Sequence, residues 1–212
     1  MKFELNLQDG EFLVKLARHA IKTFLQTRRK IDSPVDTSDK LREKCGVFVT
    51  LNNVKVSNHE LRGCIGYPSA VDPLVEATID SAIQAATNDP RFPPVSLQEL
   101  NDEIAIEVSV LTPPEPIKVE DPSEYPSRIQ IGRDGLIVER GWYKGLLLPQ
   151  VAPEWNWNEE EFLSNCCMKA GLSPDSWLIR GTKVYKFQAV IFEEKTPNGE
   201  VASKSLSVKK DR

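Results

Sequence analysis

Residues 61–68, Leu-Arg-Gly-Cys-Ile-Gly-Tyr-Pro, place a thiol two positions from a guanidinium. On an extended strand, side chains two residues apart lie on the same face, so we expect Arg62 and Cys64 to point the same way. A nearby cation favours the thiolate over the thiol, and the flanking Gly63 and Gly66 allow a ligand or another backbone to approach the sulfur. The pattern therefore predicts a site in which Cys64 reacts and Arg62 lowers its pKa.

Two other interpretations of this segment remain open. A free cysteine is often a small buried hydrophobe with no chemical role. Arg62 can instead bind an anionic ligand without covalent chemistry, although no Walker or GxGxxG loop specifies a nucleotide. A base for the thiol is hard to assign, since His59 has the opposite parity on a continuous strand and Glu107 belongs to a later strand.

A second group of candidate residues lies in Asp89-Pro90-Arg91-Phe92-Pro93-Pro94. Three prolines restrict the backbone of this loop, which holds its side chains in place. Arginine binds carboxylates and other anions through two parallel hydrogen bonds. Asp89 and Arg91 therefore form either a preorganised clamp for an anionic ligand or an internal ion pair that closes the end of the preceding helix.

Four segments, in this order, carry a resemblance to a known family. The chain resembles the AMMECR domain family over roughly residues 7–195, almost its whole length. The matching segments are Leu61-Arg62-Gly63-Cys64-Ile65-Gly66, Asp89-Pro90-Arg91-Phe92-Pro93-Pro94, Val108-Ser109-Val110-Leu111-Thr112 and Leu148-Pro149-Gln150-Val151-Ala152.

The resemblance implies an intracellular α+β protein whose family has no established activity. It adds Gln150 to the candidate ligand-binding residues Gly63, Gly66, Asp89 and Arg91. In many prokaryotes, members of the family accompany a Memo-like protein and a radical SAM enzyme, which are therefore candidate partners. This chain has no CxxxCxxC motif for an iron–sulfur cluster, so it is not itself the radical enzyme.

Composition and charge restrict the class of protein. The formal net charge of −4 provides no broad attraction to nucleic acid or to acidic lipid. The N-terminal residues lack the apolar core of a signal peptide, and no apolar run approaches the ~18 residues of a membrane span. We therefore expect a cytoplasmic protein that binds neither membranes nor nucleic acid.

The four cysteines are expected to be free thiols, because the chain carries no secretory signal. None of them forms a CxxC pair, and the chain has only two histidines, so we expect no structural metal site. We also expect no cofactor. The adjacent Cys166 and Cys167 are expected to pack in a helix.

The first half of the chain alternates helical and strand patterns. Apolar residues recur at helical spacing over residues 7–26, with Asn6 as the cap. Residues 46–51 and 61–66 are expected to form a hairpin in which Leu51 pairs with Glu60, which places Cys45 diagonally next to Cys64. Asp72 and Pro73 are expected to start a buried helix, with the proline at its first position.

The second half has the same mixture of elements. Period-two alternation predicts a strand over residues 104–110. Residues 135–140 and 143–148 are expected to form a second hairpin, followed by a helix over 158–170 capped by Asn158 and Glu161. A strand over 184–193 precedes a polar tail that we expect to fray. Trp155 and Trp157 are expected to pack at a domain edge, with a cover over the site or a partner surface as the alternatives.

These elements predict an α+β fold, mainly antiparallel sheet packed with helices, plus a smaller α/β subdomain. Residues 1–115 and 173–212 are expected to form the main domain, and residues 116–172 the subdomain. Arg62, Cys64 and the loop from Asp89 to Arg91 would then line a cleft between them.

Two functions are consistent with this sequence. The first is an intracellular enzyme, or enzyme component, that uses Cys64 and Arg62 on a small or peptide-like substrate. The second is a noncatalytic module, which binds an anionic or other small ligand or serves as an adaptor for the Memo-like and radical SAM partners.

Overall fold

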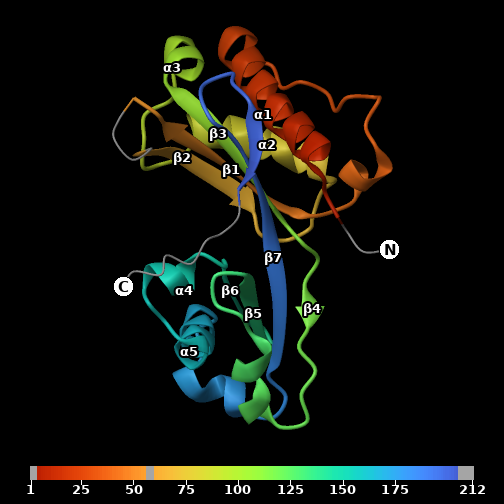
Figure 1. Ribbon diagram of the computed structural model, residues 1–212, viewed down its shortest axis with the longest axis vertical. Helices are drawn as coiled ribbons and strands as arrows, with labels where there is room; N and C mark the ends of the chain where they lie inside the picture. Colours follow the sequence, from red (N-terminus) through yellow and green to blue (C-terminus); the bar gives the residue numbers. More distant parts are fainter. Residues whose placement is uncertain (1–3, 56–59, 205–212) are drawn as a thin grey trace. The chain divides into compact units, whose positions relative to one another are not determined.

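The computed structural model describes residues 4–55 and 60–204, and Figure 1 shows the path of the chain. The chain divides into two compact units. Unit 1 contains Met1–Leu111 and Val190–Lys204, and the described part of unit 2 is Thr112–Ala189. In both units helices accompany strands that pair antiparallel, which confirms the predicted α+β class.

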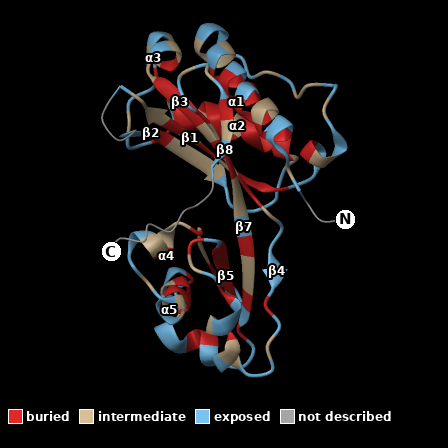
Figure 2. Cartoon of the chain, viewed as in Figure 1, coloured by how far each residue is buried: buried red, intermediate tan, exposed pale blue. Residues whose placement is uncertain are grey.

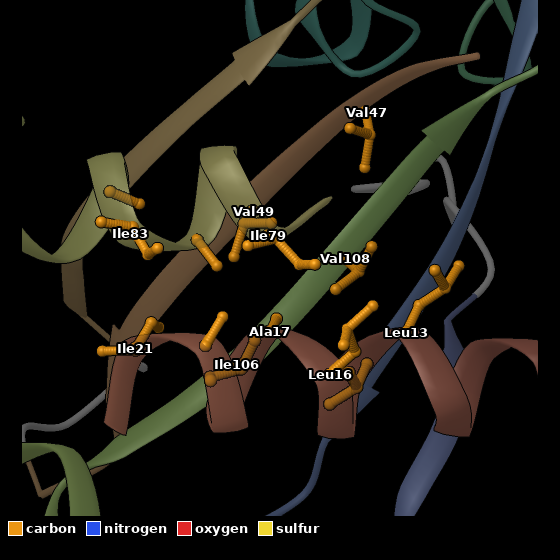
Figure 3. Packing of buried hydrophobic residues seen from close by; sticks show 14 of the residues in the cluster. Leu13, Leu16, Ala17, Ile21, Val47, Val49, Ile79, Ile83, Ile106 and Val108 are labelled. Carbon is orange, nitrogen blue, oxygen red and sulfur yellow. The ribbon is translucent and has the colours of Figure 1, made fainter. Parts of the chain in front are cut away.

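Unit 1 is built on a sheet in which β1 (Gly46–Asn53) lies between β2 (Glu60–Tyr67) and β3 (Ile104–Leu111). Helices α1 (Leu7–Thr27) and α2 (Leu74–Thr87) pack on one face of it. Figure 3 shows side chains from both helices meeting Val49 of β1 and Val108 of β3. Because side chains alternate along a strand, the residues next to these valines in each strand, Thr50 after Val49 and Glu107 before Val108, lie on the opposite face.

Local signals explain the ends of α1. The Asn6 side chain accepts from the Asp9 backbone N–H, and the Asp9 carboxylate accepts from the Asn6 N–H, so two otherwise unpaired donors are satisfied. At the other end Arg28 adopts a left-handed conformation, with φ of 60°. The predicted helix is confirmed, and Figure 2 shows a buried stripe along it.

The start of α2 differs from the prediction by one position. Pro73 is the residue before the helix rather than its first residue, and no side chain caps it. The backbone N–H of Leu74 donates instead to the Glu43 carbonyl at 3.0 Å. A long-range hydrogen bond thus replaces the local cap that Asp72 was expected to supply.

The predicted register of the first hairpin is wrong. Cys64 pairs with Thr50, three residues further along β1 than the expected partner Val47. Leu51 pairs with Gly63, but Asn52 pairs with Leu61, so Arg62 is an extra residue at a β-bulge. Residues 56–59 of the connecting turn lie outside the described part of the chain, and so does the candidate base His59.

The short elements of unit 1 complete its frame. A 3-10 turn, η1, covers Asp39–Arg42, and α3 covers Leu97–Asp102 with a capping box formed by Ser96 and Glu99. The polar tail, expected to fray, contains strand β8, Val201–Lys204, which pairs with Ile191–Glu194. That expectation is wrong for residues 201–204 because their backbone groups find partners on β7.

Strand β7 (Lys183–Glu194) contributes its first residues to unit 2, where it pairs with β5 (Asp134–Arg140). Strand β5 pairs in turn with β6 (Tyr143–Leu147), which confirms the second predicted hairpin. Helix α5 (Glu159–Lys169) has the predicted capping box of Asn158 and Glu161. The remaining elements are β4 (Glu115–Pro116), α4 (Val151–Glu154), and the 3-10 turns η2 (Pro122–Glu124), η3 (Pro126–Arg128) and η4 (Pro174–Leu178).

Unit 2 has its own apolar core, formed between α5 and the sheet. Phe162 and Leu163 are fully buried there, together with Leu136 and Val138 of β5. Cys166 and Cys167 belong to this core, which confirms that they pack rather than face solvent. Among the described residues, no helix is both long and apolar enough to cross a membrane.

A buried ion pair ties three segments of unit 1 together. The Arg18 guanidinium, on α1, contacts Glu194 through Nε and Nη2. The same guanidinium donates to the carbonyl oxygens of Leu100 at 2.8 Å and Ile104 at 2.6 Å. The Glu194 carboxylate also accepts from the Ile106 N–H at 3.0 Å. Each guanidinium nitrogen and both carboxylate oxygens therefore have a hydrogen-bond partner, as a buried ion pair requires.

Replacing Arg18 by leucine is expected to lower the free energy of unfolding by about 3–5 kcal/mol, because Glu194 is left charged and buried. Urea unfolding followed by circular dichroism measures this change. Lys15→Ala, which removes an exposed i,i+4 pair with Glu11 on the same helix, should change the unfolding free energy by less than about 0.5 kcal/mol. Equal effects for the two variants would contradict this role of Arg18.

Candidate functional site

The candidate site is a row of polar side chains across the unit 1 sheet, on the face opposite α1 and α2. Thr50 pairs with Cys64 on one side and with Glu107 on the other, so the three side chains lie side by side. The Thr50 hydroxyl donates to the Cys64 sulfur at 3.3 Å. All three residues are partly exposed. The sheet therefore brings a hydroxyl and a carboxylate to the thiol.

The backbone of Cys64 is held from the outer edge of the sheet. Strand β2 is an edge strand, so the peptide groups that point away from β1 have no strand to pair with. The Cys64 N–H donates to the Asp89 carboxylate at 2.8 Å, and the Cys64 carbonyl accepts from Arg91 Nη2 at 3.2 Å. The proline-rich loop thus supplies the hydrogen bonds that a neighbouring strand would supply.

Asp89 is itself held by Arg91. The Arg91 guanidinium donates to both carboxylate oxygens, at 2.9 and 2.7 Å, and its backbone N–H adds a third contact at 3.1 Å. The Arg91 side chain and the Cys64 N–H together hold the pKa of the Asp89 carboxyl well below its usual range. The two predicted roles are a clamp for an anionic ligand and an internal ion pair. The geometry is that of the internal ion pair, and both of its side chains hydrogen-bond to the Cys64 backbone.

Arg62 does not accompany Cys64 as expected. At the bulge its guanidinium turns to α3, where it donates to both oxygens of Glu99 at 2.5 and 3.2 Å. It also donates to the Pro93 carbonyl at 2.9 Å and lies 5.9 Å from the centre of the Phe92 ring. Bulges commonly redirect a side chain in this way. The prediction that Arg62 stabilises a Cys64 thiolate is therefore wrong in its geometry.

The pKa of Cys64 is raised, not lowered. Burial is the largest cause, and the Glu107 and Asp89 carboxylates add to it. The hydrogen bond from Thr50 and the charge of Arg91 act in the opposite direction but do not overcome burial. At neutral pH the sulfur is therefore a protonated thiol, and chemistry at this atom requires a proton acceptor.

The glycines of the motif are required by close backbone packing. A Cβ atom at Gly63 would lie 2.3 Å from the Ala85 carbonyl oxygen of α2. A Cβ at Gly66 would lie 2.2 Å from the Val47 carbonyl oxygen of β1. These contacts explain both glycines without a ligand, and their predicted ligand-binding role stays a prediction.

Glu107 belongs to a charged network that the sequence patterns did not reveal. Lys204, on β8, lies 2.8 Å from Glu107 and 3.0 Å from Glu193 of β7. The Ser109 hydroxyl lies 3.4 Å from the other Glu107 oxygen. Lys204 was missed because the tail was expected to fray. Thr50 was missed because the predicted register paired Cys64 with Val47, although a polar residue between Val49 and Leu51 already indicates the sheet face without helices.

Two other predicted residues are not members of this row. Gln150 belongs to unit 2, where it precedes α4. Cys45 and Cys64 are both free thiols, as predicted, but Cys45 is buried before the start of β1, and burial raises its pKa to about 11. Within the described part of the chain, no group of three or more His, Cys, Asp or Glu side chains is arranged to hold a metal ion.

A family model and the sequences of known proteins place this chain in the same family. The model of the AMMECR1 family matches residues 14–192. Protein PH0010 of Pyrococcus horikoshii is 58% identical over 207 residues, which cover 97% of this chain and all of that protein. A relative in Pyrococcus furiosus is 61% identical over 93% of each chain.

A solved structure agrees with this assignment. The crystal structure of the uncharacterized protein PH0010 is similar to this chain with a TM-score of 0.81 and 57% sequence identity. The similarity covers 95% of this chain and 99% of that chain. The two proteins thus share one fold along almost their whole length.

Asp89→Ala is expected to lower the free energy of unfolding at pH 7 by about 2–3 kcal/mol, because the Cys64 N–H and the Arg91 N–H lose their acceptor. Since the folded pKa of Asp89 is depressed, this stabilisation is present above the unfolded value of about 4 and is lost as the pH falls toward the folded pKa. Urea unfolding across this pH range measures both effects.

Asp80→Ala is the matched control, because Asp80 forms an exposed pair with Lys30. It should change the unfolding free energy by less than about 1 kcal/mol. If the difference between wild type and Asp89→Ala stayed constant from neutral to acid pH, the carboxylate would not be the group that holds Cys64.

Proposed function

This chain belongs to the AMMECR1 family, and we propose that it acts as an enzyme, or enzyme component, whose reacting group is the Cys64 thiol. Its substrate would be small or peptide-like. One observation supports the proposal above the others: the partly exposed thiol shares a sheet face with Thr50 and Glu107, while its backbone is fixed by Asp89 and Arg91. A positioned nucleophile with a base on the same face is the arrangement that covalent catalysis requires, and here the Thr50 hydroxyl lies between the thiol and the carboxylate.

Glu107 is the better candidate for the proton acceptor. Asp89 also acts electrostatically on Cys64, but four hydrogen bonds occupy its oxygens and its pKa lies well below the usual range, so it is a weak base. Glu107 has the polar contacts of Lys204 and Ser109 and no bidentate arginine. Fewer hydrogen bonds therefore occupy the Glu107 carboxylate than the Asp89 carboxylate, which favours Glu107 as the general base.

In the proposed step the sulfur attacks the carbonyl carbon of the substrate as its proton passes to Glu107 by way of the intervening Thr50 hydroxyl, which takes up the thiol proton and gives up its own. A carbon–sulfur bond forms, the S–H bond breaks, and the carbonyl π electrons move to the oxygen. Thr50 steadies the sulfur through its hydroxyl, and the Asp89–Arg91 pair positions the Cys64 backbone without taking part in proton transfer. Arg62 would then serve the fold of the β2 edge through Glu99 and not the chemistry.

The noncatalytic alternative is a binding or adaptor module that acts with a Memo-like protein and a radical SAM enzyme. The raised pKa of Cys64 favours it, since a neutral thiol can be a passive contact. Binding of an anion at Arg62 or Arg91 is less favoured, because each guanidinium already pairs with a carboxylate. A cytoplasmic location, in which the thiols stay reduced, belongs to the proposal in either form.

The test is the rate at which iodoacetamide alkylates Cys64, followed by mass spectrometry of the Cys64 peptide between pH 6 and 10. As a simple thiol, Cys64 should reach its half-maximal rate above the ordinary value of about pH 8.5. In Glu107→Gln the two roles of the carboxylate predict opposite results. Loss of its charge alone lowers the thiol pKa and speeds alkylation at pH 7, whereas loss of a base slows it.

We expect the rate at pH 7 to fall at least about fivefold in Glu107→Gln, within the usual contribution of a general base. Glu193→Gln, which removes the other carboxylate at Lys204, is the matched control and should leave the rate within about twofold. The Cys45 peptide in the same samples reports any general loosening of the fold. Faster alkylation in Glu107→Gln, or no labelling of Cys64 at all, would reject the enzymatic proposal in favour of the binding module.

A further inference from the structure

An exposed aromatic pair stands on unit 2, far along the chain from the Cys64 row. Trp155 and Trp157 stack with their ring centres 6.1 Å apart and 18° between their planes. Trp155 is 67% exposed, whereas Trp157 packs partly against the unit 2 core. The inner ring therefore holds the outer one in place while most of Trp155 faces solvent. A rigid exposed tryptophan is typical of sites that bind other proteins.

Carboxylates border this pair in the sequence and lack cationic partners. Glu154 ends α4, and Glu159 and Glu160 begin α5, so the three lie within five residues of Trp155. None of the three forms an ion pair with any described residue. Among the described residues, the site thus combines an open aromatic ring with three carboxylates that form no ion pair.

The fold accounts for only some of these features. Glu159 and Glu160 lie in the first turn of α5, where negative charge favours the helix. Glu154 lies within the single turn of α4, so the same effect applies to it. Trp157 contributes to the core, but Trp155 adds little burial beyond its contact with Trp157. Trp155 is therefore the residue that the fold by itself does not explain.

We propose that this surface, defined by Glu154, Trp155, Trp157, Glu159 and Glu160, binds an arginine-containing basic segment of a partner protein. A guanidinium stacks on an aromatic face and also pairs with carboxylates, and this surface offers an exposed ring with three glutamates within five residues of it in the sequence. Charge complementarity selects this partner over a second copy of the chain, because two such acidic surfaces repel each other. The inference is independent of the function proposed for Cys64.

The experiment titrates the full chain with an acetylated hexa-arginine peptide and follows the indole N–H signals of its four tryptophans by NMR. The signals of Trp155 and Trp157 should shift and saturate, while those of Trp142 and Trp177 stay in place. Substitution of each tryptophan assigns the signals. Trp142, fully exposed at the tip of the β5–β6 hairpin, controls for nonspecific contact with an exposed ring.

Affinities of the variants separate the ring from the charges. Trp155→Ala should weaken peptide binding about two- to fivefold, the range of an exposed cation–π contact, and Trp142→Ala should leave it unchanged. Glu154→Gln should also weaken binding, and high salt should reduce this effect but spare much of the Trp155 effect. Hexa-lysine should bind less tightly than hexa-arginine, since the ammonium does not stack.

Three results would overturn the proposal. They are equal shifts of all exposed indole signals, equal affinities of Trp155→Ala and wild type, and the absence of saturable binding at low salt. Concentration-dependent self-association that Trp155→Ala abolishes would show that a second copy occupies the surface instead. None of these results bears on the alkylation of Cys64.

Discussion

The candidate site depends on one interaction, the hydrogen bond from the Cys64 backbone N–H to the Asp89 carboxylate. Strand β2 is the edge of its sheet, and an edge strand has backbone groups that must find partners or remain exposed. The carboxylate takes the Cys64 N–H, and Arg91 neutralises the carboxylate while it donates to the Cys64 carbonyl. The loop therefore supplies the missing partners at this one residue of the edge strand, and it fixes the Cys64 backbone while the Thr50 hydroxyl contacts the sulfur.

This arrangement separates positioning from chemistry. The two arginines of the conspicuous motifs are occupied by carboxylates, Arg62 by Glu99 and Arg91 by Asp89. The groups beside the sulfur come instead from the neighbouring strands, with Thr50 in contact and Glu107 one strand further across the sheet. Because burial outweighs the nearby cation, the sulfur is a thiol at neutral pH, and the nearby Glu107 carboxylate adds to the rise in its pKa.

Much of the fold could be predicted from local patterns, and the failures have local causes. Helix α1 follows from apolar spacing and the Asn6 cap, and α5 from the Asn158 capping box. Continuous alternation was the wrong assumption for β2, since the bulge at Arg62 changes the pairing and turns the guanidinium to α3. Glu60 pairs with Asn53 and not with Leu51, which already displaces the register by two residues, and the extra residue at the bulge adds the third.

By itself the sequence determined the α+β class, the positions of most helices and strands, and the segments around Cys64 and Asp89 that form the candidate site. These properties depend on periodicity, caps and turn residues, which act over a few neighbouring positions. Only the tertiary structure decided that Arg62 pairs with Glu99, that Thr50 contacts the thiol with Glu107 on its other side, and that Lys204 pairs with Glu107. Such contacts join residues far apart in the chain, and their geometry depends on strand register and on which side of the sheet the helices cover.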